Sequence, residues 1–223
     1  MISSVFFDLD GTLADTAPDL TTGLNQILQK EKKLSLSIKK VKPFISRGSN
    51  AMIQMAFDIY EEDPKFQNLK KSFLTAYKKT RYHQTQVFLG IEQVLQYLEA
   101  KNIIWGVITN KPAEFTEPIM QKLNLTQQAA CIISGDTTPF KKPSPQPILY
   151  ACNITKTDPK KAVYIGDAEI DMQAGQAIGM KTLIANYGYL SENDKPKQWG
   201  ADGTISQPEK IIDWIKKENN TCY

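Results

Sequence analysis

Five short apolar runs, separated by segments of helical periodicity, are the feature that most limits how this chain can fold. The runs lie at residues 4–9, 103–108, 130–133, 162–165 and 181–184. Each is rich in β-branched or aromatic residues and is followed by turn or polar residues, as is typical of strands buried on both faces. Helical patterns lie between them at residues 90–101, 113–123, 145–152 and 170–178, and a closing helix is expected at 207–217. This alternation predicts an α/β protein with a Rossmann-like, doubly wound parallel sheet.

One long segment interrupts the alternation directly after the first strand. Residues 16–82 contain no convincing strand but three helical patterns, around 17–33, 38–60 and 64–81. Pro18 near the start of the first pattern, with Asp15 or Thr16 as its cap, is typical of a helix N-terminus. We therefore expect an inserted α-helical domain at residues 16–82 and a catalytic core formed by residues 1–15 and 83–223.

Charge and composition exclude several classes of partner. The formal net charge is +3, and the lysines are scattered among acidic residues, so no nucleic-acid binding is expected. No apolar run approaches the length that spans a bilayer, so no membrane association is expected either. Three cysteines without paired spacing, and the lack of a secretory signal, favour a reducing, cytoplasmic location. The sequence does not distinguish a monomer from a homodimer.

Polar residues gather at the predicted carboxyl ends of the strands, where parallel sheets bind their ligands. They are Asp8 and Asp10 after the first strand, Thr109 and Asn110 after the second, Lys141 and Lys142 after the third, and Asp167 and Asp171 after the fourth. Four carboxylates at close range cannot all be ionised without a counter-charge. Because no histidine or cysteine accompanies them, this all-oxygen set favours Mg²⁺.

The first of these motifs, VFFDLDGT, suggests how the site would work. Asp8 and Asp10 share the same parity along a strand and are expected to face one reaction centre, while Gly11 permits a sharp turn. A carboxylate nucleophile, a second carboxylate that moves protons, a cation, a lysine and a hydroxyl suit phosphoryl transfer through an acyl phosphate. The expected partner is a small phosphorylated metabolite.

Four motifs in order give the chain a resemblance to the haloacid dehalogenase-like hydrolases, in particular to their phosphoglycolate phosphatase-like branch. They are DLDGTLAD at residues 8–15, VITNK at 107–111, KKPSPQP at 141–147 and YIGDAEIDMQAG at 164–175. The resemblance covers nearly the whole chain. It implies that the helical insert is a cap domain, which closes over the site and excludes water.

The resemblance also implies a role for each matching residue. Asp8 would be the nucleophile and a metal ligand. Asp10 would be the general acid/base and would lend its backbone carbonyl to the metal. Asp167 would ligate Mg²⁺ directly.

The remaining motif residues would act on the phosphate and on the lysine. Thr109, with the backbone of Asn110, would hold the phosphate, and Lys142 would neutralise the phosphoaspartate, with Lys141 as the weaker candidate. Asp171 would act through a water or orient the lysine.

Within that branch, residues 45–57, 105–125 and 187–202 resemble a subgroup, the bacterial N-acetylmuramic acid 6-phosphate phosphatases of peptidoglycan recycling. N-acetylmuramate 6-phosphate and 2-phosphoglycolate both carry a carboxylate besides the phosphate. Arg47 departs from the small residue usual in that subgroup. We interpret it as a cap arginine that binds the substrate carboxylate through two parallel hydrogen bonds.

Three other functions fit parts of the pattern. A phosphomutase on the same scaffold would return the phosphate to a sugar rather than to water. A dehalogenase also uses an aspartate nucleophile but needs neither a metal nor Asp10. A phosphoacceptor signalling module combines aspartates, threonine and lysine in a parallel sheet, but it lacks an inserted cap and a general acid two residues after the nucleophile.

Overall fold

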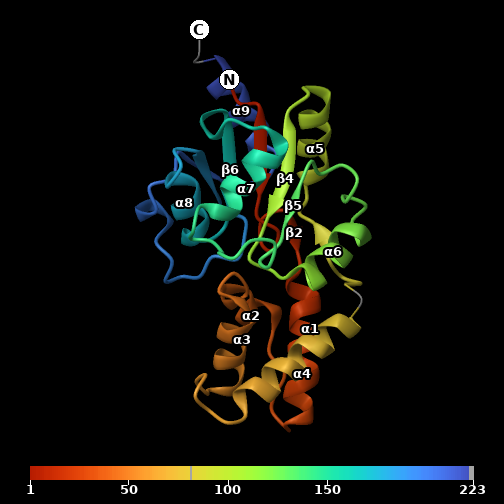
Figure 1. Ribbon diagram of the computed structural model, residues 1–223. Helices are drawn as coiled ribbons and strands as arrows, with labels where there is room; N and C mark the ends of the chain where they lie inside the picture. Colours follow the sequence, from red (N-terminus) through yellow and green to blue (C-terminus); the bar gives the residue numbers. More distant parts are fainter. Residues whose placement is uncertain (81, 221–223) are drawn as a thin grey trace.

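The computed structural model describes residues 1–80 and 82–220, and its centre is a sheet of six parallel strands in the order β5-β4-β1-β6-β7-β8 (Figure 1). The strands are β1 (Ser4–Phe7), β4 (Ile104–Ile108), β5 (Ile132–Ile133), β6 (Ala162–Gly166), β7 (Lys181–Ala185) and β8 (Gly203–Ile205). The central strand β1 pairs with β4 on one side and with β6 on the other. The predicted α/β class with a doubly wound parallel sheet is confirmed.

Alternating side chains of β1 divide the core between the two faces of the sheet. Val5 and Phe7 pack in one apolar cluster with residues of α5 (Ile91–Ala100), α6 (Ala113–Lys122) and α9 (Lys210–Asn220). Phe6 packs in a second cluster with residues of α7 (Gln146–Thr155) and α8 (Glu169–Gln176). Both faces are therefore covered, which explains why the strands read as nearly continuous apolar runs. Two short 3₁₀ helices, Pro159–Lys161 and Pro196–Gln198, lie in the connections before β6 and before β8.

Four helices lie within residues 17–79 and form a separate layer beyond the end of the sheet (Figure 1). They are α1 (Ala17–Lys30), α2 (Ile38–Ile45), α3 (Gly48–Phe57) and α4 (Phe66–Lys79). The chain leaves the sheet through β2 (Ala14–Asp15) and returns through β3 (Gln86–Val87). These two strands pair antiparallel, so the outgoing and returning segments lie side by side.

The expectation of one helix over residues 38–60 is wrong, because the chain turns between α2 and α3. Gly48 adopts a φ of +86°, in the left-handed region that glycine accepts readily and other residues rarely adopt. The break places Ser46 and Arg47 at the tip of the helical layer. The third helical pattern, predicted at 64–81, is α4, although Arg81 lies outside the described residues.

Two smaller differences concern the sheet. The strand expected at residues 130–133 contains only Ile132 and Ile133, and the three-residue edge strand β8 was not expected. Among the described residues, no helix has both the length and the apolar character needed to cross a membrane.

Candidate active site

The topology of the sheet brings the strand-end residues together. Asp8 directly follows β1, Thr109 follows β4, and Asp167 follows β6, and in the sheet β4 and β6 flank β1 on either side. The backbone N–H of Asp8 still donates to the carbonyl of Ile165 at 2.8 Å, so Asp8 remains attached to the sheet. The backbone of Asp8 is therefore held in place by strand pairing.

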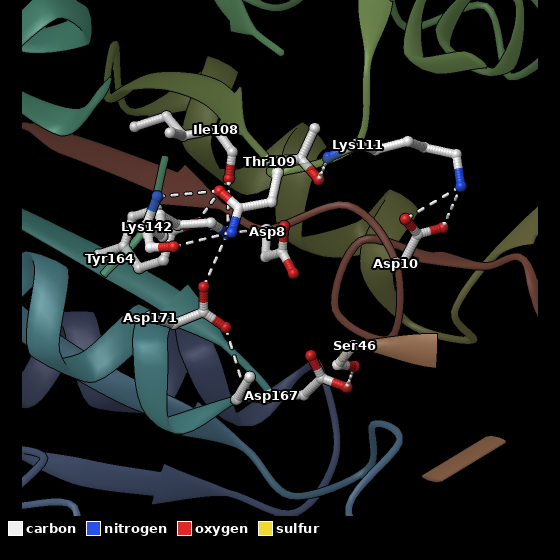
Figure 2. Close-up of polar contacts among 12 residues, drawn as sticks. Asp8, Asp10, Ser46, Ile108, Thr109, Lys111, Lys142, Tyr164, Asp167 and Asp171 are labelled. Carbon is white, nitrogen blue, oxygen red and sulfur yellow. Dashed lines mark hydrogen bonds and ion pairs between the residues drawn. The ribbon is translucent and has the colours of Figure 1, made fainter. Parts of the chain in front are cut away.

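Three carboxylates form a buried cluster at this edge (Figure 2). Asp8, Asp167 and Asp171 each offer one oxygen, and these atoms lie within 4.8 Å of one another. Burial raises the pKa of Asp8 from 3.8 to about 6, with Asp171 adding to the effect and Lys142 opposing it. Burial, followed by the charges of Asp8 and Asp171, also raises the pKa of Asp167 well above its usual range. Such a cluster favours an added positive charge.

Lys142 supplies one positive charge from within the protein. Its ammonium lies 2.9 Å from Asp8 Oδ1 and 2.7 Å from Asp171 Oδ1, and it also donates to Tyr164 Oη at 2.7 Å. Burial alone would lower the pKa of Lys142, but the carboxylates of Asp171 and Asp8 raise it well above its usual range. Lys141 is exposed. Of the two lysines that the sequence left open, Lys142 therefore faces the carboxylates.

The three carboxylates carry more negative charge than Lys142 alone neutralises, and their remaining oxygen atoms suit a hard cation. Asp167 Oδ1 is buried and has no hydrogen-bond partner among the described residues. Asp8 Oδ1 has only its ion pair with Lys142, without hydrogen-bond geometry. Oxygen atoms of this kind, with no histidine or cysteine in the cluster, are the ligands that Mg²⁺ prefers. The residues present thus fit a divalent ion held by Asp8 and Asp167.

Each oxygen of the Asp171 carboxylate binds a group of the protein. While Oδ1 binds Lys142, Oδ2 accepts a hydrogen bond from the backbone of Ala168 at 3.0 Å, at the start of α8. Gly166 makes this approach possible, because a Cβ at that position would lie 2.3 Å from Asp171 Oδ2. Of the two roles expected for Asp171, orientation of the lysine is the one that concerns a residue it contacts here.

Asp10 lies apart from the three clustered carboxylates (Figure 2). Strand β1 ends at Phe7, so the parity expected for Asp8 and Asp10 does not extend into the turn that follows. The Asp10 carboxylate instead binds Lys111 Nζ at 3.0 and 3.1 Å, and it accepts a hydrogen bond from Thr16 Oγ1. Lys111 was not singled out from the sequence, although it closes the VITNK motif.

The turn after Asp8 packs tightly against Asp167. Gly11 has a φ of +81°, and a Cβ there would lie 2.2 Å from Asp167 Oδ2. Only glycine allows the turn to approach Asp167 this closely.

Thr109 and Asn110 occupy the β4 end of the site. Thr109 is buried, and its hydroxyl oxygen accepts a hydrogen bond from the backbone of Lys111 at 3.3 Å. The Asn110 side chain bonds the backbone of Lys142 in both directions, each at 2.9 Å. The amide side chain thus holds the segment that carries Lys142.

The helical layer contacts the site through the turn between α2 and α3. Ser46 Oγ donates to Asp167 Oδ2 at 3.0 Å, a contact that was not expected from the sequence (Figure 2). Arg47 binds Asp194 Oδ1 at 3.2 Å and Ser191 Oγ at 3.3 Å, on the opposite side of the layer boundary. In this conformation the Arg47 charge is therefore already paired.

A cavity of about 870 Å³ lies between the helical layer and the sheet. Its floor includes Asp8, Thr109 and Lys142, and its opposite wall includes Lys70 and Tyr77 of α4. The volume is within the range of cavities that hold drug-sized molecules. The carboxylates thus lie at one end of a space large enough for a small organic ligand.

Comparison with known proteins agrees with this geometry. The family model described as "Haloacid dehalogenase-like hydrolase" matches residues 5–185. An N-acetylmuramic acid 6-phosphate phosphatase from Pseudomonas putida is 35% identical over 215 residues, which are 95% of this chain and 96% of that protein. A phosphoglycolate phosphatase from Xanthomonas campestris pv. campestris is 36% identical over 208 residues, covering 93% and 94% of the two chains.

Solved structures are similar over the whole length. The crystal structure of a predicted phosphoglycolate phosphatase from Haemophilus somnus 129PT has a TM-score of 0.85 and 25% identity, and the match covers 96% of this chain and 98% of that one. A match of this extent, together with the family model, leaves one conclusion. The chain belongs to the haloacid dehalogenase-like hydrolase family.

Proposed function

We propose that this protein is a Mg²⁺-dependent phosphatase that hydrolyses a small phosphate monoester through an aspartyl-phosphate on Asp8. The observation that carries the proposal is the buried contact of Lys142 with both Asp8 and Asp171, beside Asp167. A strand-end carboxylate flanked by a lysine and an oxygen-only metal site is suited to stabilising a phosphoryl group in transfer. The names of the relatives support the phosphatase class.

In this mechanism Asp8 and Asp167, with the backbone carbonyl of Asp10, would hold the metal. Bound there, Mg²⁺ would supply positive charge against the phosphate oxygens. Lys142 and Thr109 would bind the same oxygens from the β4 side. The buried Lys142 ammonium is well placed for this because Asp171 orients it at 2.7 Å.

The first chemical step makes one bond and breaks one. An oxygen of Asp8 bonds to phosphorus while the bond from phosphorus to the ester oxygen breaks, and Asp10 gives its proton to the departing oxygen. In the second step a water oxygen bonds to phosphorus, Asp10 accepts the proton of that water, and the bond between phosphorus and Asp8 breaks. Inorganic phosphate and free Asp8 are the products. Lys111 and Thr16 hold the Asp10 carboxylate in place for both proton transfers.

Residues 16–82 serve in this proposal as a cap that closes over the site. The contacts of Ser46 with Asp167 and of Arg47 with Asp194 support it, because they join the helical layer to the sheet across the cavity. A closed cap would exclude bulk water while the phosphate is transferred.

The substrate that we favour is N-acetylmuramate 6-phosphate, with 2-phosphoglycolate as the smaller candidate. A cavity of about 870 Å³ exceeds the needs of a two-carbon molecule. Two cationic side chains of the cap line the cavity, and each is a candidate to bind the carboxylate that both substrates share. Arg47 is paired with Asp194, whereas Lys70 forms no ion pair with any described residue. Lys70 is thus an alternative to Arg47 as the carboxylate ligand.

Rates on purified protein test the proposal. We expect a higher kcat/KM for N-acetylmuramate 6-phosphate than for 2-phosphoglycolate, with Mg²⁺ required for both and no sugar bisphosphate needed. A requirement for a sugar bisphosphate would instead indicate a phosphomutase. Arg47→Gln and Lys70→Gln should be compared on N-acetylmuramate 6-phosphate and on N-acetylglucosamine 6-phosphate, which lacks the carboxylate. If neither substitution raises KM for the carboxylated substrate alone, the assignment of a carboxylate-binding cation is wrong.

A further inference from the structure

The chain connects the helical layer to the sheet through two segments, around β2 and β3, so a change in the position of the layer alters the backbone of these segments. Ala14 pairs with Val87 and Asp15 with Gln86. Helix α1 begins immediately afterwards, at Ala17. We call the two paired segments, residues 14–17 and 86–88, the hinge, and the start of α1 lies in the first of them.

Of the two caps that the sequence offers for helix α1, Thr16 makes no capping hydrogen bond, and Asp15 Oδ1 accepts only from the backbone N–H of Ala17, at 3.3 Å. Thr16 occupies the N-cap position, but its hydroxyl donates to Asp10 and makes no capping hydrogen bond. The phenol oxygen of Tyr189 takes its place, accepting from the backbone N–H of Thr16 at 2.7 Å and of Ala17 at 3.0 Å. The same phenol donates to Asp15 Oδ1 at 2.6 Å. One side chain thus binds three consecutive residues of the hinge.

The backbone of Tyr189 is bound to the carboxylate cluster. Its N–H donates to Asp167 Oδ2 at 2.8 Å. The neighbouring Gly188 permits this approach, because a Cβ there would lie 2.5 Å from Asp167 Cβ. The ring is buried and lies 6.1 Å from the ring of Phe88, which belongs to the returning segment of the hinge.

We propose that Tyr189 is a positioning residue that fixes the cap hinge relative to the Asp167 carboxylate. Both ends of the connection are short hydrogen bonds to buried groups, and a rigid aromatic side chain joins them. Movement of the first turn of α1 would therefore displace the loop that carries Asp167, and movement of that loop would displace the first turn of α1. The consequence for turnover rests on the proposed phosphatase function, whereas the consequence for the hinge amides does not.

Tyr189→Phe removes the phenol oxygen and leaves the ring in place. Tyr187→Phe is the matched control, since Tyr187 lies in the same loop and also contacts Phe88, but its hydroxyl donates to the Thr12 carbonyl at 3.0 Å instead of binding residues 15–17. Amide hydrogen exchange of residues 16 and 17 is measured by NMR. We expect it to accelerate about tenfold or more in Tyr189→Phe, as loss of a buried acceptor implies, and to stay unchanged in Tyr187→Phe.

Kinetics provide a second readout on the same variants. At saturating Mg²⁺ we expect kcat of Tyr189→Phe to fall about tenfold, with that of Tyr187→Phe within about twofold of the parent. Asp15→Ala removes the acceptor of the phenol from the hinge side, and the double variant with Tyr189→Phe should be no worse than the more affected single variant. If Tyr189→Phe fails to fold, Asp15→Ala carries the exchange measurement at Thr16, because the Ala17 N–H also donates to Asp15 itself.

Exchange and turnover of Tyr189→Phe close to those of the parent would overturn the proposal. Equal effects in Tyr187→Phe would also overturn it, since they would indicate a general loss of packing. A parent protein without phosphatase activity would refute the proposed function and leave the exchange result to decide on the hinge.

Discussion

Replacing Lys142 by methionine tests how the carboxylate cluster is held together. The side chain is 1% exposed, and its ammonium contacts Asp8, Asp171 and Tyr164 within 2.9 Å. Methionine keeps most of the apolar stem but removes the charge. Two carboxylates then remain buried without their shared counter-charge.

The expected loss follows from that geometry. Removing one partner of a buried ion pair costs about 3–5 kcal/mol, because the other charge stays desolvated. For a chain of this size, each kcal/mol corresponds to a shift in Tm of about 2–4 °C. We therefore expect the metal-free variant to melt about 6–20 °C below the parent at pH 7.5.

The pH dependence gives the sign of the effect. The pKa of Asp8 is raised to about 6 in the folded protein, so the folded state binds a proton more readily than the unfolded state between pH 6 and 3.8. Folding is then favoured as the pH falls through this range. Protonation removes the uncompensated charge, so the difference between Lys142→Met and the parent should shrink at pH 5.

The assay is thermal and urea unfolding of both proteins in EDTA, at pH 7.5 and pH 5, with Lys141→Met as the control. Lys141 is adjacent but exposed, so its substitution should change the free energy of unfolding by less than about 0.5 kcal/mol. A loss below about 1 kcal/mol for Lys142→Met, or a loss that does not depend on pH, would refute the reasoning, since it would mean that the carboxylates do not need the lysine.

Three further predictions concern the metal, the turn at Gly11 and the ion pair between Lys111 and Asp10. Mg²⁺ should raise Tm at pH 7.5 but much less at pH 5, because protonation of Asp8, with its pKa of about 6, competes with the ion; equal calorimetric affinities at both pH values would contradict this. Gly11→Ala would place a Cβ 2.2 Å from Asp167 Oδ2, and it should lower kcat about 100-fold with an unchanged far-UV spectrum; activity near that of the parent would count against the tight packing. Lys111→Met leaves Asp10 without its ion pair and should reduce kcat about 10–100-fold, as measured in steady-state assays; an unchanged kcat would mean that Asp10 needs no such support.

Topology explains why much of the site was predictable from the sequence. Asp8, Thr109 and Asp167 each follow a short apolar run, and consecutive parallel strands deliver such residues to one edge. That argument needs only the order of strands and helices. It therefore holds although β5 is shorter than expected and β8 was not expected.

Local geometry that departs from regular elements was not predictable in the same way. The parity argument for Asp10 assumed a strand that continues to Asp10, whereas β1 ends at Phe7. A single long helix was expected where a turn at Gly48 separates α2 from α3. Both errors arise at turns, where the backbone leaves the regular geometry on which the periodicity of side chains depends. The contact of Ser46 with Asp167 depends on such a turn.

Contacts between distant segments are the second part that the sequence does not reveal. Tyr189 caps α1 although 172 residues separate it from Ala17. Nothing in a helix-start pattern signals that Thr16 will instead bind Asp10. The sequence does not reveal the partner of Lys111 either, since charge alone does not select one acidic residue among many.

A crystal structure with Mg²⁺ and a phosphate mimic such as beryllium fluoride tests the central claim most directly. The account predicts a metal ion between Asp8 and Asp167 and the fluoride complex on an oxygen of Asp8, within reach of Lys142. An ion bound elsewhere, or a mimic that contacts neither Asp8 nor Lys142 at saturating concentration, would contradict it.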